Sequence, residues 1–219
     1  FASIKAMTNF AINELGLELR NPFAGVYIPT SDAQKRHAIS SEDIRKIQAE
    51  CYKQDDELRH IVALISDTGL RLAEAVGLHQ EDLVLDADVP HVIVREHAWR
   101  PLKTATSHRL IPLVGASLWV AQRIKQNGFE YAFPRYTDGI KCNSNSASAA
   151  LNKWIKQVAG SGNVIHGFRH SFRDRLRAVS APIDMIDQLG GWSLQSVGQG
   201  YGDGYQLSQM KDVIVGLED

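Results

Sequence analysis

Cysteine is scarce in this sequence. The 219 residues include 2 cysteines, Cys51 and Cys142, which stand far apart and form no CxxC pair. This is too few for a disulfide framework or for a zinc site built on thiolates. We therefore expect Cys51 and Cys142 to be packing or surface thiols in a protein of the reducing cytoplasm.

Long apolar runs are lacking as well. No stretch approaches the roughly 18 apolar residues that a membrane-spanning helix needs, so we expect no membrane partner. The sequence also has no internal repeat, while apolar residues make up 44% of it, which is ample for a buried core. It begins at Phe1 rather than at Met, which indicates a fragment or a processed piece.

A surplus of basic residues is the third feature that the chain lacks. Lys and Arg number 24 against 25 Asp and Glu, a net charge of −1, whereas proteins that bind nucleic acid usually carry a positive excess. The basic residues are nevertheless clustered, and a basic face opposed by acidic ones can still bind a phosphate backbone. The two clusters contain Arg95, Arg100, Lys103 and Arg109, and then Arg169 and Arg173.

The spacing of apolar residues predicts a mainly helical chain with one small sheet. Residues 4–17 are typical of an amphipathic helix, and residues 18–38 of a linker. Ser40, with Asp43 three residues later, predicts a helix start. Residues 91–95 and 109–113 are β-type runs, the second at a sheet edge or strand end because it contains Pro112. Further helices are predicted over residues 56–65, from about 69, and over 117–126, 146–159, 166–179, 183–189, 194–200 and 207–215.

Two residues on one predicted helical turn, His166 and Arg169, are the most informative pair in the sequence. Both side chains can donate hydrogen bonds to a single phosphate. Upstream, Arg71 stands in an otherwise apolar helix, where a pair with Glu74 is the alternative to a functional role. Downstream, Tyr201 could attack a phosphate, provided that cationic neighbours lower the cost of forming the phenolate.

The order of these residues, with Lys103 before the β-type run and Trp192 before the tyrosine, resembles the tyrosine recombinase (phage integrase) family. The resemblance covers the chain from about Ser40 to its end. It implies a mainly α catalytic domain with a small three-stranded antiparallel sheet (α+β) over residues 39–219. It also implies a linker over residues 21–38 and, over residues 1–20, the last helix of a truncated core-binding domain.

The activity implied by the resemblance is site-specific DNA recombination. Tyr201 would form a 3′-phosphotyrosyl bond, which keeps the energy of the broken linkage, so neither metal, ATP nor another cofactor is expected. Tyr201 follows Trp192 by the family's nine-residue interval, and Tyr205 is the alternative nucleophile. Lys103 would protonate the leaving 5′ oxygen, and a solvated loop lysine is the alternative reading of that residue.

The remaining site residues also take their roles from the resemblance. Arg71 and Arg169 would bind the non-bridging oxygens, while His166 would either donate to the phosphate or pass on a proton. Glu74 would orient its neighbours, and His170 is expected to be structural, on a different helix face. Trp192 stands where the family has His or Trp. The commoner family string there is Leu-Gly-His, whereas this chain has Leu189-Gly190-Gly191-Trp192. The geometry of that donor is therefore open, and a core tryptophan is the alternative.

Double-stranded DNA carrying specific recombination sites is the expected partner. Arg95, Arg100, Arg109 and Arg173 are the candidates for contacts with its backbone. The resemblance implies a homotetramer on DNA, helped by DNA-bending or directionality factors, and the segment 207–217 could pack on a neighbouring protomer or on its own domain. Two other functions stay open: a recombinase-like protein that binds DNA without cutting it, and a type IB topoisomerase.

Overall fold

The computed structural model describes residues 2–26, 37–104, 107–192 and 204–217. The chain divides into two compact units, residues 1–35 and 36–219. In the first unit, α1 (Ala2–Glu14) has no buried residue. It ends three residues before the predicted Leu17, because Gly16 adopts the left-handed conformation at φ 60°. The division into units falls within the predicted linker, and the assignment of residues 1–20 to a core-binding domain stays a prediction.

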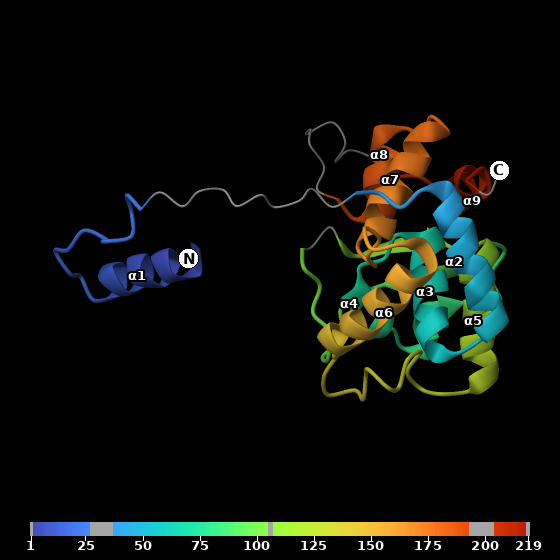
Figure 1. The fold of residues 1–219 in the computed structure, drawn as a ribbon, viewed down its shortest axis with the longest axis horizontal. Coiled ribbons are helices and arrows are strands. Elements are labelled where there is room, and N and C mark those ends of the chain that lie inside the picture. The colour runs from blue at the N-terminus through green and yellow to red at the C-terminus, as the bar shows by residue number, and fades with distance from the viewer. Residues whose placement is uncertain (1, 27–36, 105–106, 193–203, 218–219) are drawn as a thin grey trace. The chain divides into compact units, whose positions relative to one another are not determined.

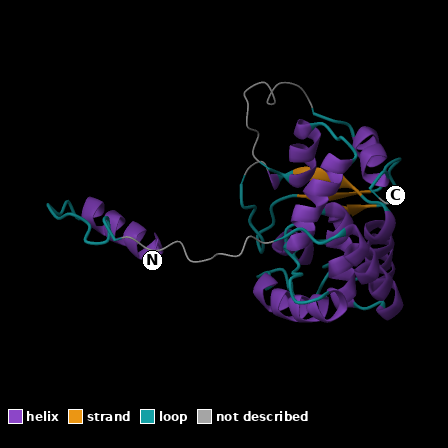
Figure 2. Ribbon diagram, turned by 45° about the horizontal axis from the view of Figure 1, so that its top comes forward, coloured by secondary structure: helices purple, strands orange, loops and turns teal. Residues whose placement is uncertain are grey.

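The second unit is a helical body with one small sheet, as predicted (Figure 2). Within the described ranges, every helix is too short or too polar to pass through a bilayer. The helices of this unit are α2 (Ser41–Gln54), α3 (Glu57–Thr68), α4 (Leu72–Val76), a 3-10 turn (Gln80–Asp82), α5 (Gly115–Asn127), α6 (Ser144–Ala159), α7 (Gly167–Ala178), α8 (Ile183–Gly190) and α9 (Leu207–Val215). The predicted helix over 194–200 lies outside the described residues.

Helix α3 forms the centre of this body, between α2, α5, α6 and α7 (Figure 1). Every residue of α3 from His60 to Thr68 is buried. The Asp56 side chain caps its first turn, and the Ser40 side chain caps α2 by accepting from the Asp43 amide, as predicted. Phe168 and Phe172 of α7 are also fully buried, so α7 is fixed against the same core.

The sheet is antiparallel, with strand order β1-β2-β3. Its strands are β1 (Leu83–Val84), β2 (His91–Val94) and β3 (Arg109–Pro112). Pro112 is the last residue of an edge strand, in agreement with the prediction from its missing amide proton. Helices α8 and α9 both contact β3, so the sheet connects the centre of the chain to its C-terminal part.

Helix α9 packs on its own domain. Its Met210 and Ile214 side chains are buried, and Val213 and Leu217 contact the core. Of the two arrangements that the sequence left open for this apolar face, the described residues show packing within the chain. The face is therefore not available for a neighbouring protomer in this structure.

Candidate active site

Arg71 lies where the chain turns from α3 into α4. It is the N-cap residue of α4, with extended backbone at φ −67° and ψ 146°. The sequence-based prediction that Arg71 lies inside a helix is therefore wrong. The turn depends on Gly69, which ends α3 in the left-handed conformation at φ 60°. A Cβ atom there would lie 2.5 Å from Cδ1 of Phe172, so this position requires glycine both for its backbone and for the space beside α7.

Glu74 is the anion around which the site is arranged. The side chain is buried and accepts from the Arg71 amide at 2.9 Å, from the Arg71 guanidinium, and from Arg109 Nη2 at 2.8 Å. Burial alone would raise the pKa of Glu74, but the Arg109 and Arg71 guanidinium groups outweigh it and lower the pKa to about 2. Glu74 is therefore ionised at neutral pH and accepts from both arginines, and its orienting role at the site stays a prediction.

Arg109 is the buried partner of Glu74, and the prediction that it contacts DNA is wrong. Its side chain is 2% exposed. Besides Glu74, the guanidinium donates to the carbonyl oxygens of Leu189 at 2.9 Å and Ser107 at 2.7 Å. Because these acceptors come from α8 and from the segment before β3, Arg109 joins three parts of the chain at one point.

Arg100 is buried as well, at 2% exposure, so its assignment to the DNA backbone is also wrong. It donates to the Arg95 carbonyl at 2.7 Å, and its aliphatic stem lies against Gly77. The Arg95 side chain is 40% exposed and pairs with the buried Asp82 carboxylate at 2.7 Å. A DNA contact by Arg95 stays a prediction.

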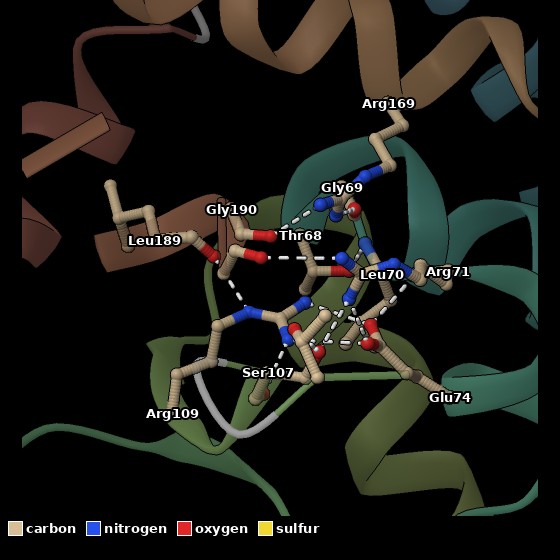
Figure 3. Close-up of polar contacts among 12 residues, drawn as sticks. Thr68, Gly69, Leu70, Arg71, Glu74, Ser107, Arg109, Arg169, Leu189 and Gly190 are labelled. Atoms are coloured by element: carbon tan, nitrogen blue, oxygen red, sulfur yellow. Dashed lines mark hydrogen bonds and ion pairs between the residues drawn. The ribbon is translucent and has the colours of Figure 1, made fainter. Parts of the chain in front are cut away.

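Arg169 approaches Arg71 from α7. It is buried, and its two terminal nitrogens donate to the carbonyl oxygens of Gly69, at 2.8 Å, and Gly190. Arg71 Nη2 donates to the next carbonyl, that of Gly191, at 3.2 Å. Burial first, and then the like charges of Arg71 and Arg109, lower the pKa of Arg169 to about 9. Figure 3 shows the side chains converging from α4, β3 and α7 on the end of α8.

Trp192 follows directly after this turn. Its ring lies under two guanidinium groups, with Cζ of Arg169 at 4.5 Å and Cζ of Arg173 at 4.6 Å from the ring centroid. A Cβ atom on Gly190 would overlap the six-membered ring, so this position excludes a side chain. Gly191 adopts φ 59° and ends α8. The Gly190–Gly191 pair, which departs from the commoner family string, thus leaves room for the indole.

His166 is the exposed N-cap residue of α7. Its ring contacts that of His170 edge-on, with centroids 5.1 Å apart. The prediction that His170 lies on a different face is wrong, because residues four apart on a helix project in nearly the same direction. A role for His166 at a phosphate stays a prediction.

Ser107 is a site residue that the sequence reasoning missed. Its buried hydroxyl accepts from Arg71 Nη1 at 3.1 Å and lies 3.0 Å from the Thr104 hydroxyl. Thr104 is next to Lys103, which is exposed in the loop between β2 and β3. The loop that carries Lys103 is therefore attached to Arg71. The only hint in the sequence is that Ser107 stands between two predicted site residues, Lys103 and Arg109.

Tyr201 lies outside the described residues, whereas Tyr205 lies within them. The Tyr205 hydroxyl donates to Asp184 at 3.0 Å, and Gln188 bonds both its amide and its carbonyl. Partial burial, followed by the hydrogen bond to Asp184 and the charge of that carboxylate, raises the pKa of Tyr205. A phenol held in this way is a poor nucleophile.

Comparisons with known proteins identify a family and a set of similar folds. The model of the phage integrase family matches residues 37–206. The fold is similar to that of the Tn1549 transposon integrase solved with transposon right end DNA, at TM-score 0.59 and 17% identity, covering 96% of this chain and 75% of that one. It is also similar to the integrase from mycobacterium phage Brujita, at TM-score 0.61 and 17% identity, covering 99% and 69%. For the XerA recombinase the TM-score is 0.57, with 17% identity and coverage of 97% and 72%. A search of curated proteins by sequence finds no match.

Proposed function

This chain belongs to the phage integrase family, and from that premise we propose that it is a site-specific DNA recombinase in which Tyr201 cuts and rejoins DNA strands. One observation carries the proposal most directly. Arg71 and Arg169, from separate helices, place their guanidinium groups at the consecutive carbonyls of Gly191 and Gly190. Two planar forks held this close are suited to the non-bridging oxygens of one phosphate.

The charge balance of the site supports a role in phosphoryl transfer. Four guanidinium groups, those of Arg71, Arg109, Arg169 and Arg173, surround two carboxylates, those of Glu74 and Asp187. Arg169 is desolvated among like charges, which lowers its pKa, and an anion beside it would relieve that repulsion. Negative charge that grows on phosphate oxygens in a pentavalent transition state would be stabilised by donors fixed in this way.

In the proposed reaction the Tyr201 oxygen attacks phosphorus, and the bond from phosphorus to the 5′ oxygen breaks. The phenol loses its proton, for which His166 is the candidate acceptor, and Lys103 gives a proton to the leaving 5′ oxygen. The resulting 3′-phosphotyrosyl ester keeps the energy of the broken linkage. A free 5′ hydroxyl can therefore reverse the step and join a new strand without ATP.

We prefer Tyr201 as the nucleophile because the contacts of the Tyr205 hydroxyl argue against Tyr205. The Tyr205 hydroxyl is already donated to Asp184, and its raised pKa disfavours the phenolate. Use of Tyr205 would require breaking that hydrogen bond and the two that Gln188 makes with its backbone. These contacts give Tyr205 a structural role at the entrance to α9.

Double-stranded DNA is the proposed partner, in line with the Tn1549 integrase, which was solved in complex with transposon right end DNA. Action on two DNA sites by four copies, with bending or directionality factors, belongs to the same proposal. In the described structure the apolar face of α9 is covered by its own domain, so a contact between copies through α9 would require this helix to leave that position.

The test uses a library of nicked duplexes with a randomised central sequence, because the target site is unknown. A nick beside the cleaved linkage lets the short strand diffuse away, so that the covalent adduct accumulates. Denaturing gels should show an adduct, and mass spectrometry of the tryptic peptides should place the DNA on Tyr201. Tyr201→Phe should abolish the adduct, and the matched control Tyr205→Phe should retain it.

Three results would contradict the proposal. Attachment at Tyr205, or at any residue other than Tyr201, would overturn the assignment of the nucleophile. Tight and selective binding of library members by the wild-type chain, with no adduct, would show a protein that recognises DNA without cutting it. Relaxation of supercoiled DNA without sequence preference would instead indicate a topoisomerase.

A further inference from the structure

Arg173 lies one turn after Arg169 on α7, and both guanidinium groups lie over the Trp192 ring. Two cations this close repel each other, and Arg173 is one of the like charges that lower the pKa of Arg169, after burial and the charges of Arg71 and Arg109. The arrangement therefore costs free energy unless other contacts offset it. The cation–π contacts of both guanidinium groups with the Trp192 ring offset part of this cost.

Asp187 of α8 supplies the second contribution. Its carboxylate, which is 2% exposed, pairs with Arg173 Nη2 at 3.2 Å. Its backbone carbonyl accepts the Trp192 amide proton at 3.0 Å. One buried residue thus holds both the cation and the backbone of the tryptophan on which that cation lies.

These contacts leave little of Arg173 for a DNA backbone, which was its predicted partner. The side chain is 24% exposed. Its Nε atom is buried and has no hydrogen-bond partner among the described residues. An arginine that serves mainly as a phosphate contact would be expected to present its donors to solvent, as long basic side chains do at surfaces.

We propose that Arg173, fixed by Asp187, is a positioning residue that holds the Trp192 indole against Arg169 and so fixes the orientation of the Arg169 guanidinium. This inference rests on the proposed function, in which Arg169 binds the phosphate under attack. Arg169 has two carbonyl acceptors, at Gly69 and Gly190, and the indole supplies the third boundary of its pocket. Without Arg173 the Trp192 ring loses one of its two guanidinium contacts and becomes free to move. Water then gains access to Arg169.

The first experiment needs no DNA and measures the environment of Trp192. Acrylamide quenching of tryptophan fluorescence is compared in the wild-type chain, Arg173→Met, and each protein carrying Trp192→Phe, so that the difference isolates Trp192. Arg173→Met should make Trp192 more accessible to the quencher. Arg177→Met, which removes an exposed cation of the same helix, should leave the quenching unchanged.

The second experiment measures adduct formation with the nicked-duplex library sequences that the wild-type chain selects. At saturating DNA, Arg173→Met should slow adduct formation by roughly 10–100-fold, the size of effect expected from a small misplacement of a reacting group. The dissociation constant should change little, and the dependence of binding on salt should keep its slope. Asp187→Asn should act in the same direction, and Arg173→Lys, which keeps the charge without the planar fork, should restore only part of the rate.

Two outcomes would overturn the inference. If Arg173→Met weakened binding, reduced the salt slope by about 1 and left the saturated rate unchanged, Arg173 would be a phosphate contact. Folding of Arg173→Met and Asp187→Asn is verified by circular dichroism. If quenching of Trp192 is unchanged in both variants, Arg173 does not hold the indole in place. Failure of the wild-type chain to form any adduct would count against the proposed function, and the quenching result would still decide the positioning role.

Discussion

Arg71 and Arg169 donate hydrogen bonds to consecutive carbonyl oxygens, those of Gly191 and Gly190, although the two arginines belong to different helices. One peptide unit at the end of α8 therefore sets the spacing between the two guanidinium groups. Glu74 holds Arg71 from the other side. Changes that move either glycine carbonyl should act on both cations together.

Gly69→Ala tests the turn that presents Arg71. A Cβ atom at φ 60° costs about 1–2 kcal/mol, and the overlap with Phe172 should add about 1–3 kcal/mol. The matched control is Gly128→Ala, since Gly128 has φ 68° and open space around its Cα, so that only the backbone cost applies. Urea unfolding should show the larger loss for Gly69→Ala, and equal losses would mean that the contact with Phe172 is unimportant.

Arg109→Met should lower the free energy of unfolding by about 3–5 kcal/mol, because it leaves the buried Glu74 carboxylate without its more deeply buried cation. The exposed pair of Lys46 and Glu42 offers a comparison, and Lys46→Ala should cost far less because solvent screens that pair. Denaturant unfolding of both variants gives the measurement. A small loss for Arg109→Met, accompanied by weaker DNA binding, would restore the surface role predicted from the sequence.

Stability should depend on pH through Glu74. The pKa of this carboxyl falls from about 4.5 to about 2 on folding, so its contribution is fully present above pH 4.5 and is lost as the pH falls towards 2. The contribution is on the order of 3 kcal/mol, at about 1.4 kcal/mol per unit. The free energy of unfolding is measured between pH 2 and pH 6 for the wild-type chain and for Glu74→Gln. The difference between the two free energies should shrink as the pH falls. A difference that stays constant over this range would rule out the Glu74 titration as its source.

Lys103→Ala should slow adduct formation by about 10²–10⁴-fold if Lys103 protonates the leaving 5′ oxygen. A substrate in which sulfur replaces that bridging oxygen should restore most of the rate, because a thiolate leaves without a proton. Lys153→Ala, at an exposed position of α6, serves as the control and should behave like the wild-type chain on both substrates. A defect that the sulfur substrate does not relieve would assign Lys103 to binding.

The fold was predictable from the sequence because its signals are local. Capping by Ser40 and the restriction at Pro112 act within a few residues, and both features appear where the sequence places them. The partners of charged residues are not local. Arg109 resembles a surface cation in sequence, yet it lies on β3 and pairs with a buried carboxylate on α4. Arg71 was placed within a helix because Gly69 was not recognised as the end of α3.

The candidate site was predictable in composition but not in geometry. The set of Arg71, Arg169 and Trp192 could be chosen from the sequence, and the structure brings these three together. The roles of Ser107 and Asp187 could not be predicted, because each residue acts through a backbone carbonyl as well as through its side chain. Periodicity carries no information about such contacts.

The pairing of Arg71 and Arg169 with peptide carbonyls also bears on selectivity towards small anions. A free phosphate ion or mononucleotide would have to replace hydrogen bonds that these arginines already make, and would gain little by the exchange. A long duplex, anchored by many contacts outside the site, can drive the same replacement. If the proposed function is correct, the chain should therefore bind the abundant small phosphates of the cell weakly and bind polymeric DNA tightly.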